Sequence, residues 1–174
     1  GQMQRELASL ENKAPGTVAD VGEAIQSVLD FIAQLPSLEI RLRIASIQPD
    51  LVAATHPVVL HQVLISIIKR LAAHTLAGAL TIYARLEDGD ARITLTGPVD
   101  PDHPIDEAGF TAEIPVPAGV SIETHLEQDH AFVWVTVPSV GKVSVLVVDD
   151  NEDMIRFYRD ATIGTRYHMT SRTK

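Results

Sequence analysis

The longest apolar pattern of the chain lies in residues 56–75, HPVVLHQVLISIIKRLAAHT. Apolar residues recur there at the spacing of one helix face: Leu60, Val63, Leu64, Ile67 and Leu71. Ile65, Ile68 and Ala72 widen this stripe, so neighbouring elements have to cover it from more than one side. The pattern predicts a buried helix around which the first two-thirds of the chain folds.

Residues around this stretch predict where the helix begins and ends. Thr55 is the expected N-cap, because its hydroxyl can accept a hydrogen bond from a free amide of the first turn. Pro57 falls in that turn, where the missing N–H of proline costs nothing. Gly78 is the expected end of the helix.

A second helix and a strand are expected before the central helix. Asp20 and Glu23 make a start that resembles a capping box, and the helical pattern after them continues until Pro36. Residues 40–44 alternate strictly between apolar and charged side chains, which is typical of a strand with one buried face. Residues 51–54 predict a short extended piece that leads into the central helix.

Two hairpins are expected after the central helix. One covers residues 80–96 and turns at Asp88-Gly89, and the other covers residues 120–137 and turns at Gln128-Asp129. Between them, residues 97–119 hold five of the ten prolines, which predicts a loop. The order of elements predicts an α/β fold, a two-layer sandwich with helices on one face of a mixed sheet.

The composition is that of an ordinary globular protein, with 45% apolar and 21% charged residues. The net charge of −9 and the lack of a lysine or arginine cluster argue against nucleic acid as a partner. No cysteine is present, which excludes disulfides and thiolate metal sites. No apolar run is long enough for a membrane span, and the N-terminus has no signal-peptide pattern, so we expect a cytoplasmic protein.

The histidines do not predict a metal or catalytic site. Their spacing lacks the i, i+4 pair of a His-Glu-x-x-His motif, and no serine stands in a nucleophile elbow. We therefore expect surface or capping roles for all seven: His56, His61, His74, His103, His125, His130 and His168.

Residues 1–16 form a short polar segment before the first predicted helix. Met3, Leu7 and Leu10 stand at helical spacing, and residues 14–16 are a turn or linker. The segment is too short to be a stable helix alone. Its apolar residues are expected to contact something else, in one or two helical turns.

The central helix resembles the asparagine-bearing helix of the histidine-kinase ATPase family. Leu60, Gln62, Val63 and Leu64 match the Leu-x-Gln-Val-Leu frame of that helix, and the resemblance extends over residues 17–139. It implies the two-layer ATPase fold, with ATP and Mg²⁺ as family ligands. The family's two asparagines are replaced, however, by Ser66 and Arg70.

The resemblance also implies that the nucleotide site is degenerate. In the family, an Asp-x-Gly-x-Gly turn binds the adenine, and of this turn only Gly97 remains. Residues 97–119 hold neither a Gly-x-Gly turn nor a helix pattern. We therefore interpret Ser66, Arg70 and Gly97 as a remnant nucleotide pocket in a pseudo-ATPase, with no bound cofactor and no catalysis expected. Two alternatives stay open: weak ATP binding with Arg70 on a phosphate, and a small-molecule sensor that uses the vacated pocket.

The last part of the chain begins with an unbroken apolar run, residues 143–148, followed by Asp149 and Asp150. A run without alternation predicts a strand buried on both faces, with the two acids at its carboxyl end. A helix is expected over residues 154–161, with Asn151 as its cap, Ile155 and Tyr158 roughly on one side and Gly164 at its end. Residues 167–170 are expected to begin a second strand.

This run, Leu-Val-Val-Asp-Asp-Asn-Glu, resembles the start of the receiver domain of response regulators. The resemblance implies a truncated βαβ start of a flavodoxin-like receiver over residues 142–174, with Asp149 and Asp150 as Mg²⁺ ligands. With two of the usual three acids, Mg²⁺ should bind poorly and phosphoryl acceptance should be absent; the acids can also simply cap the helix.

Together the two resemblances imply a two-component signalling protein whose partners are other phosphorelay proteins. The expected organisation is an N-terminal segment (residues 1–16), an ATPase-like domain (17–139) and an incomplete receiver (142–174). A buried strand without its neighbours would expose apolar surface. Residues 143–174 are therefore expected to pack on the first domain, to exchange with a second chain in a homodimer, or to be partly disordered.

Overall fold

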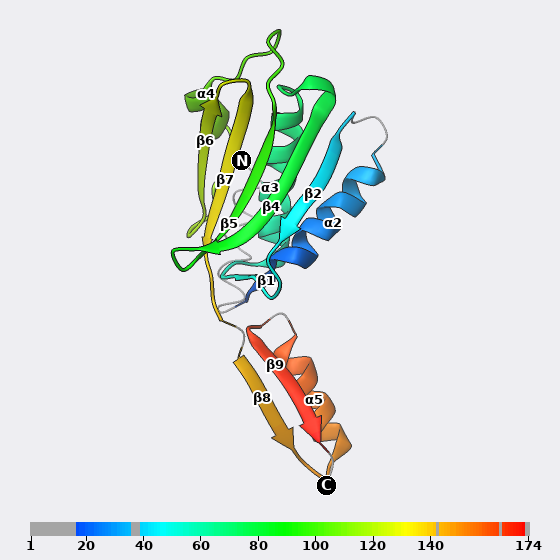
Figure 1. Ribbon diagram of the computed structural model, residues 1–174. Coiled ribbons are helices and arrows are strands. Elements are labelled where there is room, and N and C mark those ends of the chain that lie inside the picture. Colours follow the sequence, from blue (N-terminus) through cyan, green and yellow to red (C-terminus); the bar gives the residue numbers. More distant parts are fainter. Residues whose placement is uncertain (1–16, 36–38, 142, 164, 173–174) are drawn as a thin grey trace.

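The computed structural model describes residues 17–35, 39–141, 143–163 and 165–172. A five-stranded mixed sheet carries helices on one face, and a second, smaller sheet with its own helix follows it in the chain (Figure 1). The predictions for Met3, Leu7 and Leu10, for the linker at residues 14–16 and for helix ends at Pro36 and Gly164 lie outside the described residues.

Helix α2 (Val21–Ala33) begins as predicted. Asp20 is its N-cap and accepts a hydrogen bond from the amide of Glu23 at 3.1 Å. Its apolar stripe is buried: Val21, Ala24, Ile25, Val28 and Ile32. The stripe fixes which face of α2 turns toward the sheet.

The central helix α3 (Pro57–Ala72) forms where it was predicted, but both of its predicted ends are wrong. His56, not Thr55, is the N-cap, and its Nδ1 accepts a hydrogen bond from the amide of Val58 at 3.2 Å. Thr55 is buried, and its amide bonds the carbonyl of Ala53 instead. The helix already ends at Ala72, and Gly78 closes the following 3₁₀ turn η1 (Leu76–Gly78) with a φ of 61°.

The five strands of the main sheet lie in the order β2-β4-β5-β7-β6, so each hairpin, β4 with β5 and β6 with β7, forms one adjacent pair. Strands β2 and β4 are parallel, and the other pairs are antiparallel. The strands are β2 (Arg41–Ile47), β4 (Ala79–Glu87), β5 (Asp90–Pro98), β6 (Ser121–Glu127) and β7 (His130–Pro138). Two residues each of β1 (Ala19–Asp20) and β3 (Val52–Ala53) form a separate antiparallel pair.

Both predicted hairpins are confirmed. Asp88 and Gly89 have φ values of 53° and 89°, the left-handed backbone that a tight hairpin turn requires. Gln128 has a φ of 52° at the second turn. These turns set the registers, which pair Glu87 with Asp90 and Glu127 with His130.

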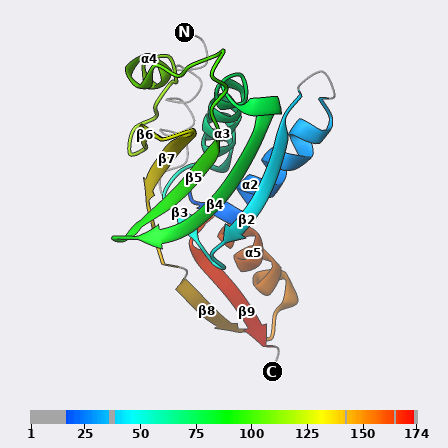
Figure 2. The same ribbon diagram turned by 45° about the horizontal axis from the view of Figure 1, so that its top comes forward.

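The core lies between the helices and one face of the sheet (Figure 2). Seven residues of α3 are buried: Val59, Leu60, Val63, Leu64, Ile67, Ile68 and Leu71. Alternate residues of the central strands close the core from the sheet, among them the fully buried Ile82, Ile93 and Leu95. The predicted two-layer α/β sandwich is confirmed.

No helix formed by the described residues lies over the other face of the sheet (Figures 1 and 2). Alternation along β7 turns the chain's single tryptophan, Trp134, to this face, because its neighbours Val133 and Val135 are buried in the core. The guanidinium carbon of Arg92 lies 5.7 Å from the centre of its ring, and His125 stacks on it at 5.9 Å. Arg92 also donates to Glu87 at 2.8 Å. Contacts between polar and aromatic side chains therefore cover this face in place of a second helical layer.

The prediction of a loop over residues 97–119 is wrong in its middle. A short helix, α4 (Glu107–Ala112), forms there, and its N-cap Asp106 accepts from the amide of Gly109 at 3.2 Å. Only Phe110 of this helix is buried. One apolar anchor leaves no periodic signal in the sequence, which is why the proline content suggested a loop.

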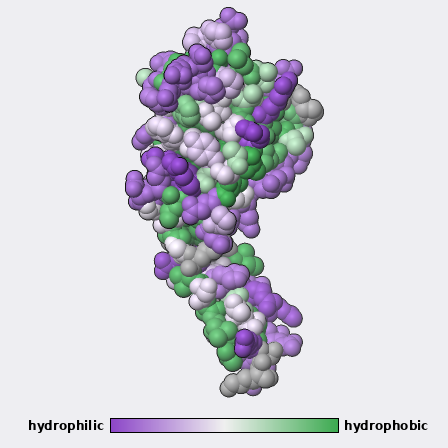
Figure 3. Space-filling model, viewed as in Figure 1, coloured by the Kyte–Doolittle hydropathy of each residue, from purple (hydrophilic) through white to green (hydrophobic). Residues whose placement is uncertain are grey.

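The C-terminal part forms the predicted strand, helix and strand: β8 (Val143–Val148), α5 (Glu152–Thr162) and β9 (Tyr167–Arg172). The two strands pair in parallel, from Val143 with Tyr167 to Val148 with Arg172. The prediction that β8 is buried on both faces is wrong, because Leu146 is 61% and Val148 50% exposed. Two strands and one helix cannot enclose it, and apolar side chains stay at the surface of this unit (Figure 3).

The packing at Gly97 leads to a first prediction. This glycine lies in β5 opposite Ala131, and an added Cβ would overlap the carbonyl oxygen of Ala79 and lie 2.9 Å from the side chain of Thr75. Gly97→Ala should therefore lower the free energy of unfolding in urea by about 1–3 kcal/mol. Gly141→Ala is the control, since a Cβ there meets nothing within 4 Å; an equal effect of both changes would contradict the explanation.

Candidate functional site

Ser66 and Arg70 line one cavity on the helical layer, next to the end of α4. The cavity has a volume of about 590 Å³. Its lining combines apolar, cationic and neutral polar side chains with one carboxylate: Phe31, His61, Gln62, Ile65, Ser66, Lys69, Arg70, Glu113, Ile114 and Pro115. The structure thus brings together two of the three residues predicted for a remnant nucleotide pocket.

Gly97, the third predicted residue, does not line this cavity. It is buried in β5, where β4 approaches it closely. Packing between strands by itself accounts for a glycine at this position. A lone glycine after a strand is a weak signal for a nucleotide turn, because close strand packing selects the same residue.

Arg70 is engaged by the segment that follows β5. Its Nη1 lies 2.5 Å from Oε2 of Glu113, and its guanidinium carbon lies 5.6 Å from the ring centre of Phe110. Its side chain is only 32% exposed, whereas that of Glu113 is 70% exposed. The arginine therefore ties α3 to α4, and its charge is already compensated by a carboxylate.

A second set of contacts fixes the start of the same segment. The Nδ1 of His74 lies 2.9 Å from the carbonyl oxygen of His103, and its ring contacts Phe110 edge-on at 6.4 Å. Asp100 accepts from the amide of Asp102, and also from Nδ1 of His103 at 3.0 Å. The amide bond first and the histidine second lower the pKa of Asp100 below its ordinary value of 3.8.

Asp149 and Asp150 follow β8, at its carboxyl end as predicted. The Oδ1 of Asp149 accepts from the amide of Asn151 at 2.8 Å, and Asn151 caps α5 by accepting from the amide of Asp153. Among the residues that the structure describes, no three His, Cys, Asp or Glu side chains are grouped so as to hold a metal ion. Asp149 therefore stabilises the turn into α5.

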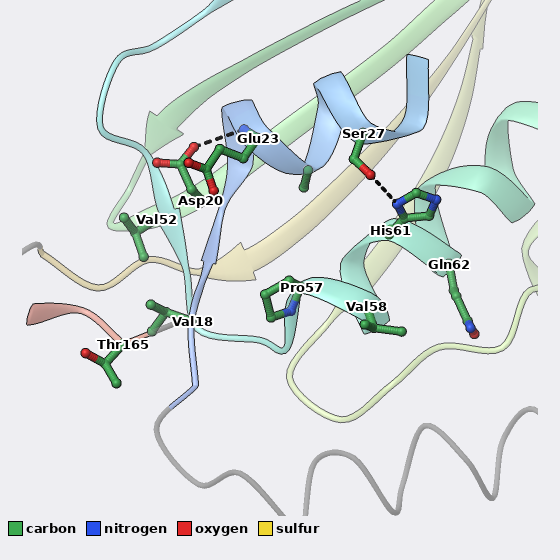
Figure 4. A pocket seen from close by; sticks show the side chains of 11 residues that line it. Val18, Asp20, Glu23, Ser27, Val52, Pro57, Val58, His61, Gln62 and Thr165 are labelled. Atoms are coloured by element: carbon green, nitrogen blue, oxygen red, sulfur yellow. Dashed lines mark hydrogen bonds between the residues drawn. The ribbon is translucent and has the colours of Figure 1, made fainter. Parts of the chain in front are cut away.

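A further cavity, of about 620 Å³, opens between α2 and the start of α3 (Figure 4). Ser27 and His61 turn toward each other across it, with the serine Oγ 3.1 Å from Nδ1 of the imidazole. Sequence analysis missed this pair because its members are 34 residues apart and belong to no motif. Its other lining residues are Val18, Asp20, Glu23, Ala24, Val52, Pro57, Val58, Gln62 and Thr165.

Solved structures with a similar fold are catalytic domains of histidine kinases. The catalytic domain of histidine kinase ThkA, in a nucleotide-free form, is 16% identical at a TM-score of 0.54; the match covers 70% of this chain and 95% of that one. The mycobacterial sensor histidine kinase MprB is 14% identical at a TM-score of 0.51, with coverages of 70% and 96%.

The cytoplasmic segment of histidine kinase QseC is 11% identical at a TM-score of 0.54, with coverages of 78% and 85%. No protein-family model matches the chain, and no curated protein matches it. At these identities the likeness concerns the fold, which is the mixed α/β fold of the histidine-kinase ATPase type. None of the helices in the described residues is long and apolar enough to span a membrane.

The contacts of Arg70 lead to a second prediction. Arg70→Ala removes both the ion pair and the cover over Phe110, whereas Glu113→Gln removes only an exposed charge, which contributes about 0–1 kcal/mol. Hydrogen exchange of the Phe110 amide, which bonds the carbonyl of Asp106, should therefore accelerate much more in Arg70→Ala. Equal acceleration in both variants would mean that the ion pair alone holds α4.

Proposed function

We propose that residues 17–139 form a catalytically inactive ATPase-like domain in a two-component signalling protein. In this proposal the domain acts through its shape and contacts, and it regulates or positions the receiver-like residues 142–174. The observation that carries the proposal is the engagement of Arg70. The cation at the position of the family's second asparagine is paired with Glu113 and covered by Phe110.

The donors in the 590 Å³ cavity do not fit Mg²⁺ and nucleotide. Magnesium prefers carboxylate and other oxygen ligands. Among the described lining residues the carboxylate is that of Glu113, which Arg70 already binds. The other side-chain oxygens belong to Ser66 and Gln62. A triphosphate would have to displace Glu113 in order to reach Arg70. These contacts support a domain that does not bind ATP in the usual way.

The receiver part of the proposal rests on the C-terminal βαβ unit. Its parallel strands, the connecting helix and the two acids after β8 agree with the start of a receiver. A histidine kinase of similar fold, ThkA, has been crystallised in complex with a response regulator protein, at 17% identity and a TM-score of 0.52. That complex supports a protein of the phosphorelay as the partner of this chain.

A small-molecule sensor is the second candidate. The same cavity combines apolar side chains such as Phe31 and Ile65 with the exposed cation of Lys69. Such a lining favours a small anionic ligand with an apolar part. A compound that stays bound through purification would support this candidate over the first.

Calorimetric titration with nucleotide tests the inactive-domain proposal. We expect no heat of binding for ATP or ADP up to millimolar concentration, with or without Mg²⁺, because the carboxylate among the described lining residues and Arg70 already bind each other. Micromolar binding would contradict the proposal. If such binding were lost in Arg70→Ala and kept in Glu113→Gln, the arginine would be identified as the phosphate contact and the kinase hypothesis would replace ours.

A thermal-shift measurement tests the acidic pair. Millimolar Mg²⁺ should leave the melting temperature unchanged within about 1 °C, because a ligand stabilises only when its concentration exceeds its dissociation constant. Asp149→Asn/Asp150→Asn should behave like the unchanged chain. A rise of several degrees that disappears in the double variant would show that a working metal site exists.

A further inference from the structure

The face of the main sheet that carries Trp134 has charged side chains on four of its five strands. They point to this face because they alternate along the strands with residues of the core, such as Leu42 and Ile93. The cations are all arginine: Arg41, Arg43, Arg85 and Arg92. The carboxylates are equal in number: Glu87, Asp90, Glu123 and Glu127. The face as a whole therefore carries no net charge, although the chain has a net charge of −9.

Near the turn between β4 and β5, the charges of this face compensate one another. Glu87 accepts from Arg85 at 2.9 Å and from Arg92 at 2.8 Å. Asp90 stands opposite Glu87 in the ladder of the two strands. Two arginines and two carboxylates therefore form a cluster without net charge near the middle of the sheet.

The charges at the two edges of the sheet are not compensated in this way. Arg41 and Arg43 belong to the edge strand β2, whereas Glu123 and Glu127 belong to the edge strand β6. None of these four side chains takes part in an ion pair between described residues. One edge of the face is therefore positive and the other negative, at four strand spacings, or about 19 Å, from each other.

The strand registers place the two kinds of charge level with each other. Arg41 pairs with Ala79, and Glu127 pairs with His130. His130 pairs with Pro98, and the register of β4 with β5, continued by two residues, puts Pro98 level with Ala79. One row of residues across the sheet thus begins at Arg41 and ends at Glu127.

The middle of the face has the composition of a protein interface. Three aromatic side chains, Tyr83, Phe132 and Trp134, are half-buried there and alternate with buried residues of their strands. The centres of protein interfaces are enriched in aromatic residues and arginine and depleted in lysine, and the five strands contain no lysine. A nucleic acid would meet four carboxylates on this face, so a protein surface is the occupant that fits.

We infer that two copies of this chain pack these faces against each other about a two-fold axis that runs along the strands. Such an axis reverses the strand order, so β2 of one copy lies over β6 of the other and each row lies over the same row. Arg41 then faces Glu127 of the second copy. The row of Arg43 ends at His125, so this arginine lies between Glu123 and Glu127 of the second copy. Each contact occurs twice.

The size and shape of the face also suit a second copy. Five strands at about 4.8 Å spacing and about 3.3 Å per residue make a face of about 600 Å², which gives about 1,200 Å² for two copies. This area reaches the lower end of the range for specific protein interfaces. Two sheets that twist with the same hand remain parallel when they are packed face to face. The inference goes beyond the proposed function and does not depend on it.

Chemical crosslinking tests the arrangement in the full chain, which contains no cysteine of its own. Arg41→Cys/Glu127→Cys places two thiols at opposite edges of one sheet, and a bismaleimide too short to span the sheet can join them only between copies. Arg41→Cys/Ser121→Cys is the matched control, because Ser121 points to the same face at the other end of β6, about 20 Å from Glu127. The first pair should crosslink at least about tenfold faster than the control.

Charge exchange gives an independent measurement. Sedimentation velocity at up to about 100 µM protein should show a dimer of the 18.9 kDa chain. Arg41→Glu or Glu127→Arg alone places like charges opposite each other and should raise the dissociation constant at least about tenfold. Arg41→Glu/Glu127→Arg restores opposite charges and should return the constant to within about threefold of its original value. Arg156→Glu, which reverses an exposed charge on α5, is the control and should leave the constant unchanged.

Three results would overturn the inference. A chain that stays monomeric over the whole concentration range would leave the face to a different partner. A dimer that tolerates both single charge reversals would assign the contact to another surface, such as the exposed apolar side chains of β8 and α5. Equal crosslinking rates for the two cysteine pairs would exclude the two-fold arrangement.

Discussion

The five-stranded sheet and the helices on its face depend on the burial of α3 between α2 and the sheet. Seven side chains of α3 are buried, each contributing about 1.5–3 kcal/mol relative to an exposed position. That burial is possible only because the central strands present alternate apolar residues to the same face. The sheet that buries α3 also needs closely packed strands, and at Gly97 β4 approaches β5 so closely that no side chain fits.

Polar side chains of α3 and of the turn that follows it hold the neighbouring segments in place. Arg70 reaches Glu113 and Phe110 after β5, His74 reaches the carbonyl of His103, and His61 reaches Ser27 of α2. One helix therefore fixes both the segment over residues 99–119 and the position of α2. His61 and Arg70, which line the 590 Å³ cavity, thus have structural partners within the chain.

The elements that leave a periodic pattern of apolar residues or a turn signal could be predicted from the sequence. Helix periodicity located α2 and α3, alternation and turn residues located both hairpins, and the unbroken apolar run located β8. Features that depend on one contact were missed: the cap at His56, the single anchor Phe110 that holds α4, and the pairing of Ser27 with His61. The apolar run of β8 predicted burial on both faces, whereas the missing neighbours of the strand predicted exposed apolar surface, and the structure agrees with the second expectation.

The site was predictable to the same extent. Ser66 and Arg70 are four residues apart on one helix, so their presence in one cavity follows from helical geometry. Gly97 was included in the predicted pocket only because the chain resembles the histidine-kinase ATPase family. The carboxylate that neutralises Arg70 comes from a segment 43 residues later, and no spacing rule connects the two. Nothing in the sequence therefore showed that the cation was already occupied.

The position of the single tryptophan has a practical consequence for measuring stability. Trp134 lies on the uncovered face of the sheet, between Arg92 and His125. Its fluorescence therefore reports on the five-stranded sheet, while the described residues of β8, α5 and β9 contain no tryptophan. Unfolding followed by fluorescence and by circular dichroism would separate into two transitions if the C-terminal unit melts on its own.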